Sequence, residues 1–341
     1  MKAAPVIRAL AQYPQVRQVL VHTGQHYDFN MSDVFFQQLG MPAPDVNLQV
    51  GSGSHARQTA EIMTRLEPVV LEQRPDWVLV YGDVNSTVAA ALVCSKIGIK
   101  VAHVEAGLRS FDRTMPEEIN RLVTDSLADL LFTPSRDGDG NLLREGVDPG
   151  KIHLVGNVMI DTLVRMLPAC AEHLPTDVPA EFALVTLHRP SNVDDLPWLK
   201  AMLEKLQSLA ANVEVLFPVH PRTRKNLAEI NLNGALGHLR LLEPLPYLSF
   251  LALQQRAALV ITDSGGIQEE TTYLGVPCLT VRENTERPVT IEVGTNQLVG
   301  RDLPRIADSA RAILSGQSKN GSRPPLWDGH TADRIAKILV R

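Results

Sequence analysis

Short apolar runs rich in Val, Ile and Leu alternate with helical patterns along nearly the whole chain, and this order restricts the fold more than any other feature. Nearly continuous apolar runs are typical of strands that are covered on both faces. A repeated strand–helix–strand order favours parallel strands joined by crossover helices. We therefore predict an α/β fold with two doubly wound, Rossmann-like sheets.

The predicted strands form two groups on either side of a segment rich in proline and polar residues, 168–179. Their ranges are 16–24, 76–83, 100–107, 129–135 and 151–157 in the first group, and 181–188, 214–220, 239–245, 258–264 and 277–282 in the second. The length of 341 residues exceeds the roughly 250–300 residues that one hydrophobic core usually organises. We expect two domains, 1–165 and 166–329, followed by a terminal helix at 330–341 that Thr331 caps.

Charge and composition exclude several classes of partner. The net charge of −5 and the pI near 6.1 give no reason to expect nucleic acid or an anionic membrane as a partner. The sequence has no apolar run approaching the ~20 residues of a membrane span, and its first residues do not resemble a signal peptide. The three cysteines, Cys94, Cys170 and Cys278, lie far apart and fit buried thiols in a reducing compartment. We expect a cytoplasmic protein.

Polar residues gather where the predicted strands end, which is where open α/β sheets bind their ligands. They are Gln25 and His26, Asp83, His103 and Glu105 in the first half, and His188 with Arg189, His220, the Asp263–Gly266 segment and Arg282 in the second. We expect a ligand that contacts both domains. His103 and Glu105 are the only tight pair of potential metal ligands and have no evident third partner, so we assign no metal.

The segment Ser264-Gly265-Gly266 follows an apolar run and opens a helix. Free backbone N–H groups and the positive end of a helix dipole make such a turn suitable for a phosphate. Two carboxylates follow in the same helix, Glu269 and Glu270, which favour the helix dipole or contact a second part of the same ligand.

Three acidic residues each have a structural and a functional interpretation. Asp83 could be a simple N-cap for the helix that follows it. Glu105 would be half buried, which raises a carboxyl pKa and suits an acid or base, unless Arg109 pairs with it. Glu117 lies in a helix start, Pro116-Glu117-Glu118, where an acid favours the dipole.

Two histidines follow predicted strands in the second half. A single histidine is usually structural, but His188 ends a strand next to Arg189 and suits a phosphate contact or proton transfer. His220 has a similar place in a more basic and more solvated segment.

Ten segments together resemble the non-hydrolysing UDP-N-acetylglucosamine 2-epimerases of bacteria, in family order and spacing over essentially residues 2–341. They are HTGQHYD, YGDVNST, HVEAGLRS, MPEEINR, GNVMIDTL, TLHRPSN, VHPR, EPLPYLSF, TDSGGIQEETTYLGVP and ENTERP. The resemblance implies the glycosyltransferase-B (GT-B) architecture of two Rossmann-like domains, with the helix at 330–341 crossing back onto the first. It also implies a homodimer.

The resemblance also assigns residues to a UDP-sugar site. Ser264, Gly265 and Gly266 would hold the diphosphate and Glu270 the ribose, while Phe250 and Arg287 match further nucleotide contacts. The implied reaction inverts C2 of UDP-GlcNAc to give UDP-ManNAc, through loss and re-addition of UDP. The family's acidic trio matches Asp83, Glu105 and Glu117, and its phosphate-side histidine matches His188. No cofactor and no metal is implied.

Some family members bind a second UDP-GlcNAc as an activator, in a pocket that matches Gln25, Arg189 and His220. Family members also begin with an apolar strand and a GTRPE-type loop. This chain starts after both, and Lys2 aligns with the substrate-side lysine that ends the loop. A missing central strand would leave its two neighbours unpaired.

Other functions fit the same motifs. One is a 2-epimerase of another UDP-N-acetyl sugar, such as a 2,3-diacetamido uronic acid, and another is a catalytically impaired UDP-sugar-binding remnant. A hydrolysing relative that releases free ManNAc and a glycosyltransferase also share these features.

Overall fold

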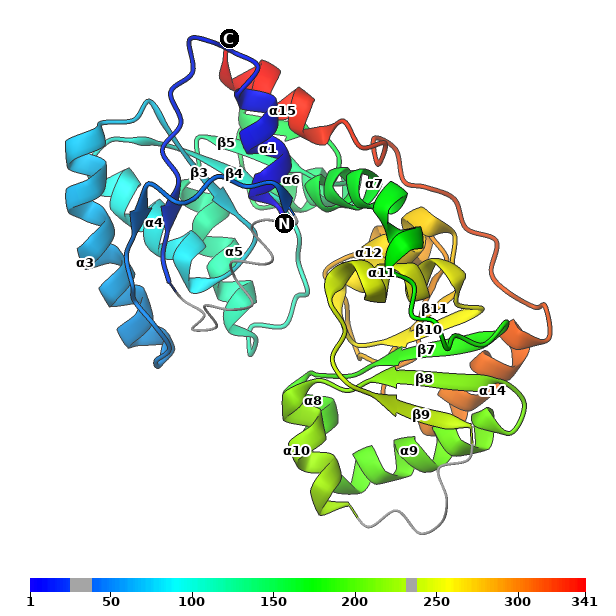
Figure 1. The fold of residues 1–341 in the computed structure, drawn as a ribbon. Helices are drawn as coiled ribbons and strands as arrows, with labels where there is room; N and C mark the ends of the chain where they lie inside the picture. The colour runs from blue at the N-terminus through cyan, green and yellow to red at the C-terminus, as the bar shows by residue number, and fades with distance from the viewer. Residues whose placement is uncertain (25–38, 231–237) are drawn as a thin grey trace. The chain divides into compact units, whose positions relative to one another are not determined.

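The computed structural model describes residues 1–24, 39–230 and 238–341, which divide into two compact units (Figure 1). Unit 1 comprises Met1–Thr162 and Pro325–Arg341, and unit 2 comprises Leu163–Pro324. In each unit, parallel strands form a sheet with helices on both faces. The predicted α/β fold with two Rossmann-like sheets is confirmed.

Unit 2 contains a six-stranded sheet in the order β12-β11-β10-β7-β8-β9, and every pair is parallel. The strands are β7 (Phe182–Thr186), β8 (Glu214–Pro218), β9 (Leu239–Leu242), β10 (Leu259–Thr262), β11 (Cys278–Thr280) and β12 (Asn296–Leu298). The chain moves outward from β7 to β9, and then returns to the other side of β7 with β10. This is the doubly wound order, whose switch point lies between β7 and β10.

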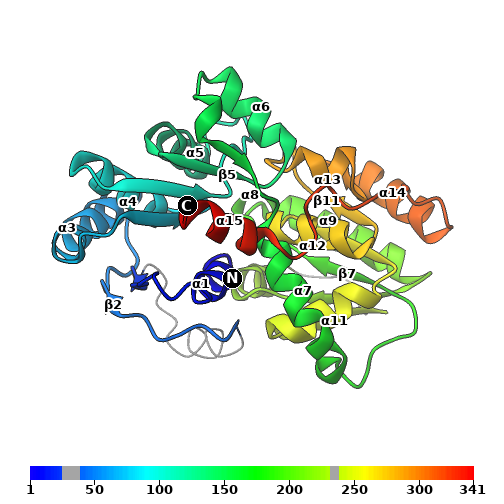
Figure 2. The same cartoon turned by 90° about the horizontal axis from the view of Figure 1, so that it is seen from above.

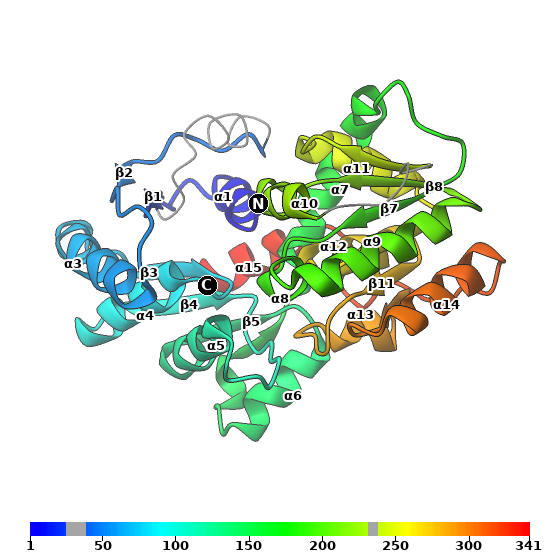
Figure 3. The ribbon, with the colours of Figure 1, turned by 90° about the horizontal axis from the view of Figure 1, so that it is seen from below.

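Helices cover both faces of this sheet. They are α8 (Pro190–Val193), α9 (Leu196–Ala210), α10 (Pro221–Glu229), α11 (Tyr247–Arg256), α12 (Gly265–Leu274), α13 (Pro288–Glu292) and α14 (Leu303–Leu314). One core joins α9 and α14 to one face of the sheet, and a second joins α11 and α12 to the other (Figures 1 and 3). Because β7 and β10 are buried on both faces, their sequences are apolar except for the threonine that ends each strand.

Unit 1 has a four-stranded parallel sheet in the order β3-β4-β5-β6 and a separate parallel pair, β1-β2. The strands are β1 (Val21–His22), β2 (Val46–Asn47), β3 (Trp77–Tyr81), β4 (Lys100–Val104), β5 (Leu130–Thr133) and β6 (Ile152–Leu154). Only two residues of the predicted strand 16–24 are extended and paired. Among the described strands, β1 pairs only with β2, and β3 pairs only with β4.

The helices of unit 1 are α1 (Ala3–Leu10), α3 (His55–Gln73), α4 (Asn85–Lys96), α5 (Pro116–Leu127), α6 (Arg136–Arg144) and α15 (Thr331–Leu339), and α7 (Val158–Cys170) continues from unit 1 into unit 2. Short 3₁₀ turns occupy Pro149–Lys151 and Ala171–His173. One core contains residues of α3 and α4, and the opposite core contains α1 and α15, which lie side by side (Figure 2).

The predicted cap of the last helix is wrong. The helix begins at Thr331 itself, with His330 in the capping position and no side-chain cap from either residue. The carboxylate of Asp161 performs this role instead, since it accepts the N–H groups of Thr331 at 3.1 Å and Ala332 at 2.7 Å. An acid more than 160 residues away in the chain leaves no local sequence signal.

In the part of the chain that the structure describes, no helix is both long enough and apolar enough to cross a bilayer. All three cysteines are free and buried.

Candidate functional site

At the switch point of unit 2, the buried carboxylate of Asp263 organises the loop after β7. It accepts the backbone N–H groups of His188 at 3.1 Å and Arg189 at 2.9 Å and the side-chain amide of Asn192 at 3.0 Å, and His188 Nδ1 lies 3.0 Å from it. Burial alone would raise the pKa of Asp263, but the contacts with His188, Arg189 and Asn192 outweigh it and lower the pKa. An ionised Asp263 therefore orients the His188 ring. Sequence reasoning placed Asp263 at the strand end but gave it no role.

The turn after β10 leads directly into α12. Ser264 is extended, with φ −84° and ψ 132°, and the helix starts at Gly265. A Cβ atom at Gly265 would lie 2.6 Å from Nη1 of Arg287, so the guanidinium lies against the turn and would have to move for any larger residue. Gly266 is the next residue of this first helical turn. A helix start beside a guanidinium can bind a doubly charged anion such as a diphosphate.

Buried acids hold the Arg287 guanidinium in place. Its Nε lies 2.7 Å from Glu269 Oε1, and its Nη1 pairs with Glu286, which also binds Arg282 at 2.7 Å. Burial raises the pKa of Glu286, but Arg287 and Arg282 outweigh this effect and hold the pKa far below its usual range. The first of the two glutamates in α12 thus orients a cation.

The second glutamate, Glu270, has a different environment. It is buried and accepts a hydrogen bond of 2.8 Å from the hydroxyl of Tyr247 in α11. Burial raises the pKa of Glu270 to about 7, and the bond from Tyr247 opposes this shift. Phe250, one turn further along α11, packs against the core on this side of the sheet. Sequence reasoning gave Tyr247 no role, although it lies in the matched segment EPLPYLSF.

The three residues matched to an activator pocket do not all fall within the described structure. Arg189 Nε donates to the carbonyl of Asp263 at 3.0 Å. The ring of His220, exposed at the start of α10, lies 6.1 Å from that of His188. Gln25 lies outside the described residues. The structure therefore brings His188, Arg189 and His220 together at the ends of β7 and β8.

In unit 1, the N-cap interpretation of Asp83 is wrong. Helix α4 begins at Asn85 with Val84 in the capping position, and no side chain caps it. The Asp83 carboxylate forms an ion pair with Arg121 of α5. Sequence reasoning missed Arg121, whose partner is 38 residues away along the chain.

Glu105 follows β4 in an unusual backbone conformation. Its φ of +76° lies in the left-handed region, which costs a non-glycine residue roughly 1–2 kcal/mol. Its buried carboxylate pairs with the ammonium of Lys2. The same ammonium lies 2.5 Å from where a Cβ atom of Gly82 would be, so Lys2 lies over the end of β3.

The alternative pairing of Glu105 with Arg109 is wrong. Arg109 is buried and binds two other acids, Asp125 at 2.7 Å and Glu145 at 2.7 Å. The cation that pairs with Glu105 is therefore Lys2 and not Arg109.

The neighbouring glutamates at the start of α5 differ in burial. Glu118 is buried, accepts the backbone N–H groups of Ser110 at 3.0 Å and Phe111 at 2.9 Å, and pairs with Arg121 at 2.7 Å. Burial by itself raises the pKa of Glu118, but the bonds from Ser110 and Arg121 outweigh it and lower the pKa. Glu117, which the resemblance assigns to catalysis, is half-buried on the first turn. Arg121 thus joins Asp83 to Glu118.

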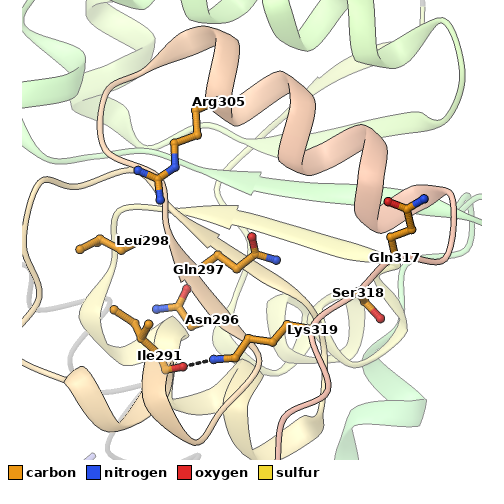
Figure 4. A pocket seen from close by; sticks show the side chains of 8 residues that line it. All are labelled: Ile291, Asn296, Gln297, Leu298, Arg305, Gln317, Ser318 and Lys319. Carbon is orange, nitrogen blue, oxygen red and sulfur yellow. Dashed lines mark hydrogen bonds between the residues drawn. The ribbon is translucent and has the colours of Figure 1, made fainter.

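Among the residues that the structure describes, no three His, Cys, Asp or Glu side chains form a group that could hold a metal ion. A cavity of about 740 Å³ opens at the edge strand β12 of unit 2 (Figure 4). Its walls are Ile291, Asn296, Gln297, Leu298, Arg305, Gln317, Ser318 and Lys319. None of the predicted site residues lines this cavity, so it lies apart from the site at the switch point.

Two Rossmann-like sheets, a glycine-rich helix start beside a guanidinium, and a group of carboxylates at the strand ends define an α/β enzyme of the GT-B fold type. Comparison with known proteins agrees. The family profile described as UDP-N-acetylglucosamine 2-epimerase matches residues 8–340. The chain belongs to this family.

Two relatives and one crystal structure are similar to this chain over nearly their whole length. The UDP-N-acetylglucosamine 2-epimerase of Methanocaldococcus jannaschii is 42% identical, over 100% of this chain and 95% of the relative. The crystal structure of that organism's UDP-GlcNAc 2-epimerase in complex with UDP-GlcNAc and UDP superposes with a TM-score of 0.89, over 99% of this chain and 96% of the other. The UDP-2,3-diacetamido-2,3-dideoxy-D-glucuronate 2-epimerase of Pseudomonas aeruginosa is 40% identical, over 100% of this chain and 96% of the relative.

Proposed function

We propose that this protein inverts C2 of UDP-N-acetylglucosamine to give UDP-N-acetylmannosamine, for the synthesis of cell-surface polysaccharides. The observation that carries the proposal is the match of the family profile to residues 8–340. The position of Arg287 against the Ser264–Gly266 turn supports it. We also propose that the enzyme acts in the cytoplasm as a homodimer.

No neighbouring carbonyl acidifies the C2 proton, so the proposed reaction couples its removal to the loss of UDP. A base takes the C2 hydrogen while the C1–O bond breaks, which releases UDP and leaves a C1–C2 double bond in 2-acetamidoglucal. An acid then adds a proton to C2 from the opposite face, and a diphosphate oxygen of UDP attacks C1 to restore the glycosidic bond. No electron acceptor or donor is needed, because atoms and charge balance over the two steps.

Unit 2 supplies the groups that bind the leaving UDP. In this proposal the helix start at Ser264, Gly265 and Gly266, with Arg287, stabilises the negative charge that develops on the diphosphate. His188, which Asp263 orients, contacts the same phosphates. A carboxylate such as Glu270 can accept hydrogen bonds from both ribose hydroxyl groups, and Phe250 packs near the nucleotide.

Unit 1 supplies the acids and bases. Asp83, Glu105 and Glu117 exchange the C2 proton on the two faces of the sugar. Lys2 neutralises Glu105 in the free enzyme and contacts the substrate in the complex. The strained backbone at Glu105 supports this role, because such strain is concentrated at functional sites.

The decisive experiment follows UDP-GlcNAc with the purified enzyme in D₂O by NMR. The proposal requires UDP-ManNAc to appear, deuterium to enter C2, and 2-acetamidoglucal with UDP to accumulate to a small extent. Binding of UDP with no deuterium at C2 would instead identify a non-catalytic UDP-sugar-binding protein. Free ManNAc without UDP-ManNAc would identify a hydrolysing enzyme.

A second candidate substrate is a UDP-2,3-diacetamido uronic acid, because a relative with that name is 40% identical over the whole chain. Its uronate carboxylate requires a cation beyond those that bind the diphosphate. Parallel assays with both UDP sugars at equal concentration decide between them by the ratio of kcat/KM.

We propose in addition that a second UDP-GlcNAc activates the enzyme through Arg189, His220 and Gln25. The proximity of the His220 and His188 rings supports a coupling between this pocket and the phosphate site. Sigmoidal dependence of the initial rate on UDP-GlcNAc concentration tests this proposal, and hyperbolic kinetics contradict it.

A further inference from the structure

His103, in β4, is completely buried, and both of its ring nitrogens contact hydrogen-bond acceptors. Nε2 lies 2.8 Å from the carbonyl oxygen of Gly82, and Nδ1 lies 2.6 Å from Oδ1 of Asp125. Because a carbonyl oxygen has no hydrogen to give, Nε2 must be the donor to Gly82.

The carboxylate of Asp125 is also an acceptor. Its second oxygen accepts the N–H of Gly107 at 3.0 Å and pairs with Arg109 at 2.7 Å. Burial raises the pKa of Asp125, but His103 and Arg109 outweigh the burial and lower the pKa. An ionised carboxylate only accepts hydrogen bonds, so Nδ1 of His103 must donate as well. The ring therefore carries a hydrogen on each nitrogen and is an imidazolium.

This hydrogen-bond network connects two turns, and each turn carries one of the proposed acids. Gly82 immediately precedes Asp83, and Gly107 lies two residues after Glu105. Glu105 needs such support because its φ of +76° is unfavourable for a residue with a side chain. The carbonyl of Phe132 accepts its N–H at 3.0 Å, and the Asp125–Gly107 bond holds the other end of the turn.

We propose that His103 is a positioning residue, an imidazolium that fixes the turns of Asp83 and Glu105 relative to each other through Gly82 and Asp125. The inference rests on the proposed epimerase function for its catalytic consequence. The double protonation and the burial of the His103 ring do not depend on that function. The other charged groups of the network are Arg109, which pairs with Asp125, and Glu145, which pairs with Arg109.

Two substitutions of His103 separate its two hydrogen bonds. In His103→Gln the side-chain amide can occupy the place of Nε2 and keep the bond to Gly82. In His103→Asn the amide occupies the place of Nδ1, keeps the bond to Asp125 and leaves the Gly82 carbonyl without a donor. We expect kcat to fall about 10-fold in His103→Gln and about 100-fold in His103→Asn, with KM within about threefold of wild type, because a small misplacement of catalytic groups lowers the rate.

His153→Gln is the matched control. His153 lies in β6 of the same sheet, is half-buried, and takes no part in the network around Asp125. Its kcat and KM should remain within about twofold of wild type. Equal losses of kcat in both His103 variants, or wild-type kcat in a folded His103→Asn, would overturn the positioning role.

A spectroscopic measurement tests the charge on the ring without any turnover. In ¹⁵N-histidine-labelled enzyme, one histidine should show protonated nitrogen shifts at both ring positions, and these signals should vanish in His103→Gln. A spectrum in which His103 has one unprotonated nitrogen overturns the inference. A wild-type enzyme with the imidazolium signals but no epimerase activity would contradict the proposed function instead, and so the two failures are distinguishable.

Discussion

Adjacent glutamates on α5 illustrate how single residues with the same chemistry take different roles. Glu118 is buried, accepts hydrogen bonds from the Ser110–Phe111 loop and pairs with Arg121. Glu117 lies one position earlier, and its residue is only half-buried. Adjacent helical positions are about 100° apart around the axis, so only one of the two can enter the same network.

We expect the same change, glutamate to glutamine, to lower activity at position 117 and stability at position 118. Glu117→Gln should lower kcat by about 10²–10⁴-fold with the melting temperature unchanged, because it removes an acid or base without removing packing. Glu118→Gln should lower the stability by about 3 kcal/mol, because it leaves Arg121 buried beside a neutral group. Thermal unfolding and steady-state kinetics of both variants check this. A stable and fully active Glu117→Gln variant would remove Glu117 from the proposed acidic trio.

The stability difference should also depend on pH. Because the folded pKa of Glu118 lies below the ordinary value of 4.5, its stabilisation is complete above pH 4.5 and disappears as the pH falls through the folded pKa. The melting temperature of Glu118→Gln should therefore approach that of wild type on acidification.

The sequence predicted where the polar residues lie but not which charges pair. Asp83, Glu105 and His188 could be located because they follow apolar strands, and parallel strands end at a common edge. Their partners are Arg121, Lys2 and Asp263, which lie 38, 103 and 75 residues away in the chain. Ion pairs of this kind depend on the packing of helices and loops, and no local pattern reports that packing.

At the scale of elements, the start of α12 combines two requirements in one turn. Residue 265 must be small because the Arg287 guanidinium lies against it, and in the proposed function this guanidinium supplies the counter-charge for the diphosphate. Glu269, in the same helix, holds Arg287 through its Nε at 2.7 Å. The composition Ser-Gly-Gly with following glutamates is therefore explained by this packing as well as by the helix dipole.

Gly265→Ala tests this arrangement. The new Cβ atom would lie 2.6 Å from Nη1 and 2.9 Å from Cζ of Arg287, so the guanidinium must move away from the proposed diphosphate site. One lost charge-assisted hydrogen bond is worth roughly 1.5–3 kcal/mol, which corresponds to at least about a tenfold rise in KM or in the Kd for UDP. Calorimetric titration with UDP measures the change directly.

Gly140→Ala in α6 provides the control for the glycine substitution itself. A Cβ atom there would contact only the end of Arg144, at 3.9 Å, and the position is helical. This variant should bind UDP like wild type and be more stable by about 0.5–1 kcal/mol. Equal UDP affinity in both alanine variants would contradict the proposed place of the diphosphate.

At the scale of the whole molecule, unit 1 is assembled from both ends of the chain. The last helix, α15, packs beside α1, and the indole of Trp327 donates to the carbonyl of Pro134 at 2.9 Å. The fold class could be predicted because strand and helix patterns are local, and a terminal helix was recognisable from its periodicity. The docking of that helix was expected from the family resemblance, whereas its attachment through Asp161 could not be foreseen.

Asp161 attaches α15 to α7, and its removal should loosen α15. Asp161→Ala leaves the buried N–H groups of Thr331 and Ala332 without their acceptor, which should destabilise unit 1 by roughly 2–4 kcal/mol. Asp161→Asn retains one carbonyl acceptor and should have about half this effect. Hydrogen exchange followed by mass spectrometry should show faster exchange in peptides of α15 and α1.

Because unit 2 has its own two cores, its peptides should keep their exchange rates in both Asp161 variants. Asp308→Ala, on an exposed part of α14 in unit 2, controls for the loss of an acid and should change stability by less than about 0.5 kcal/mol. Equally accelerated exchange in the α9 and α14 peptides of Asp161→Ala would mean that the two units unfold together. In that case the bond from Asp161 to α15 would stabilise the whole chain, because loosening one terminal helix would then release both sheets.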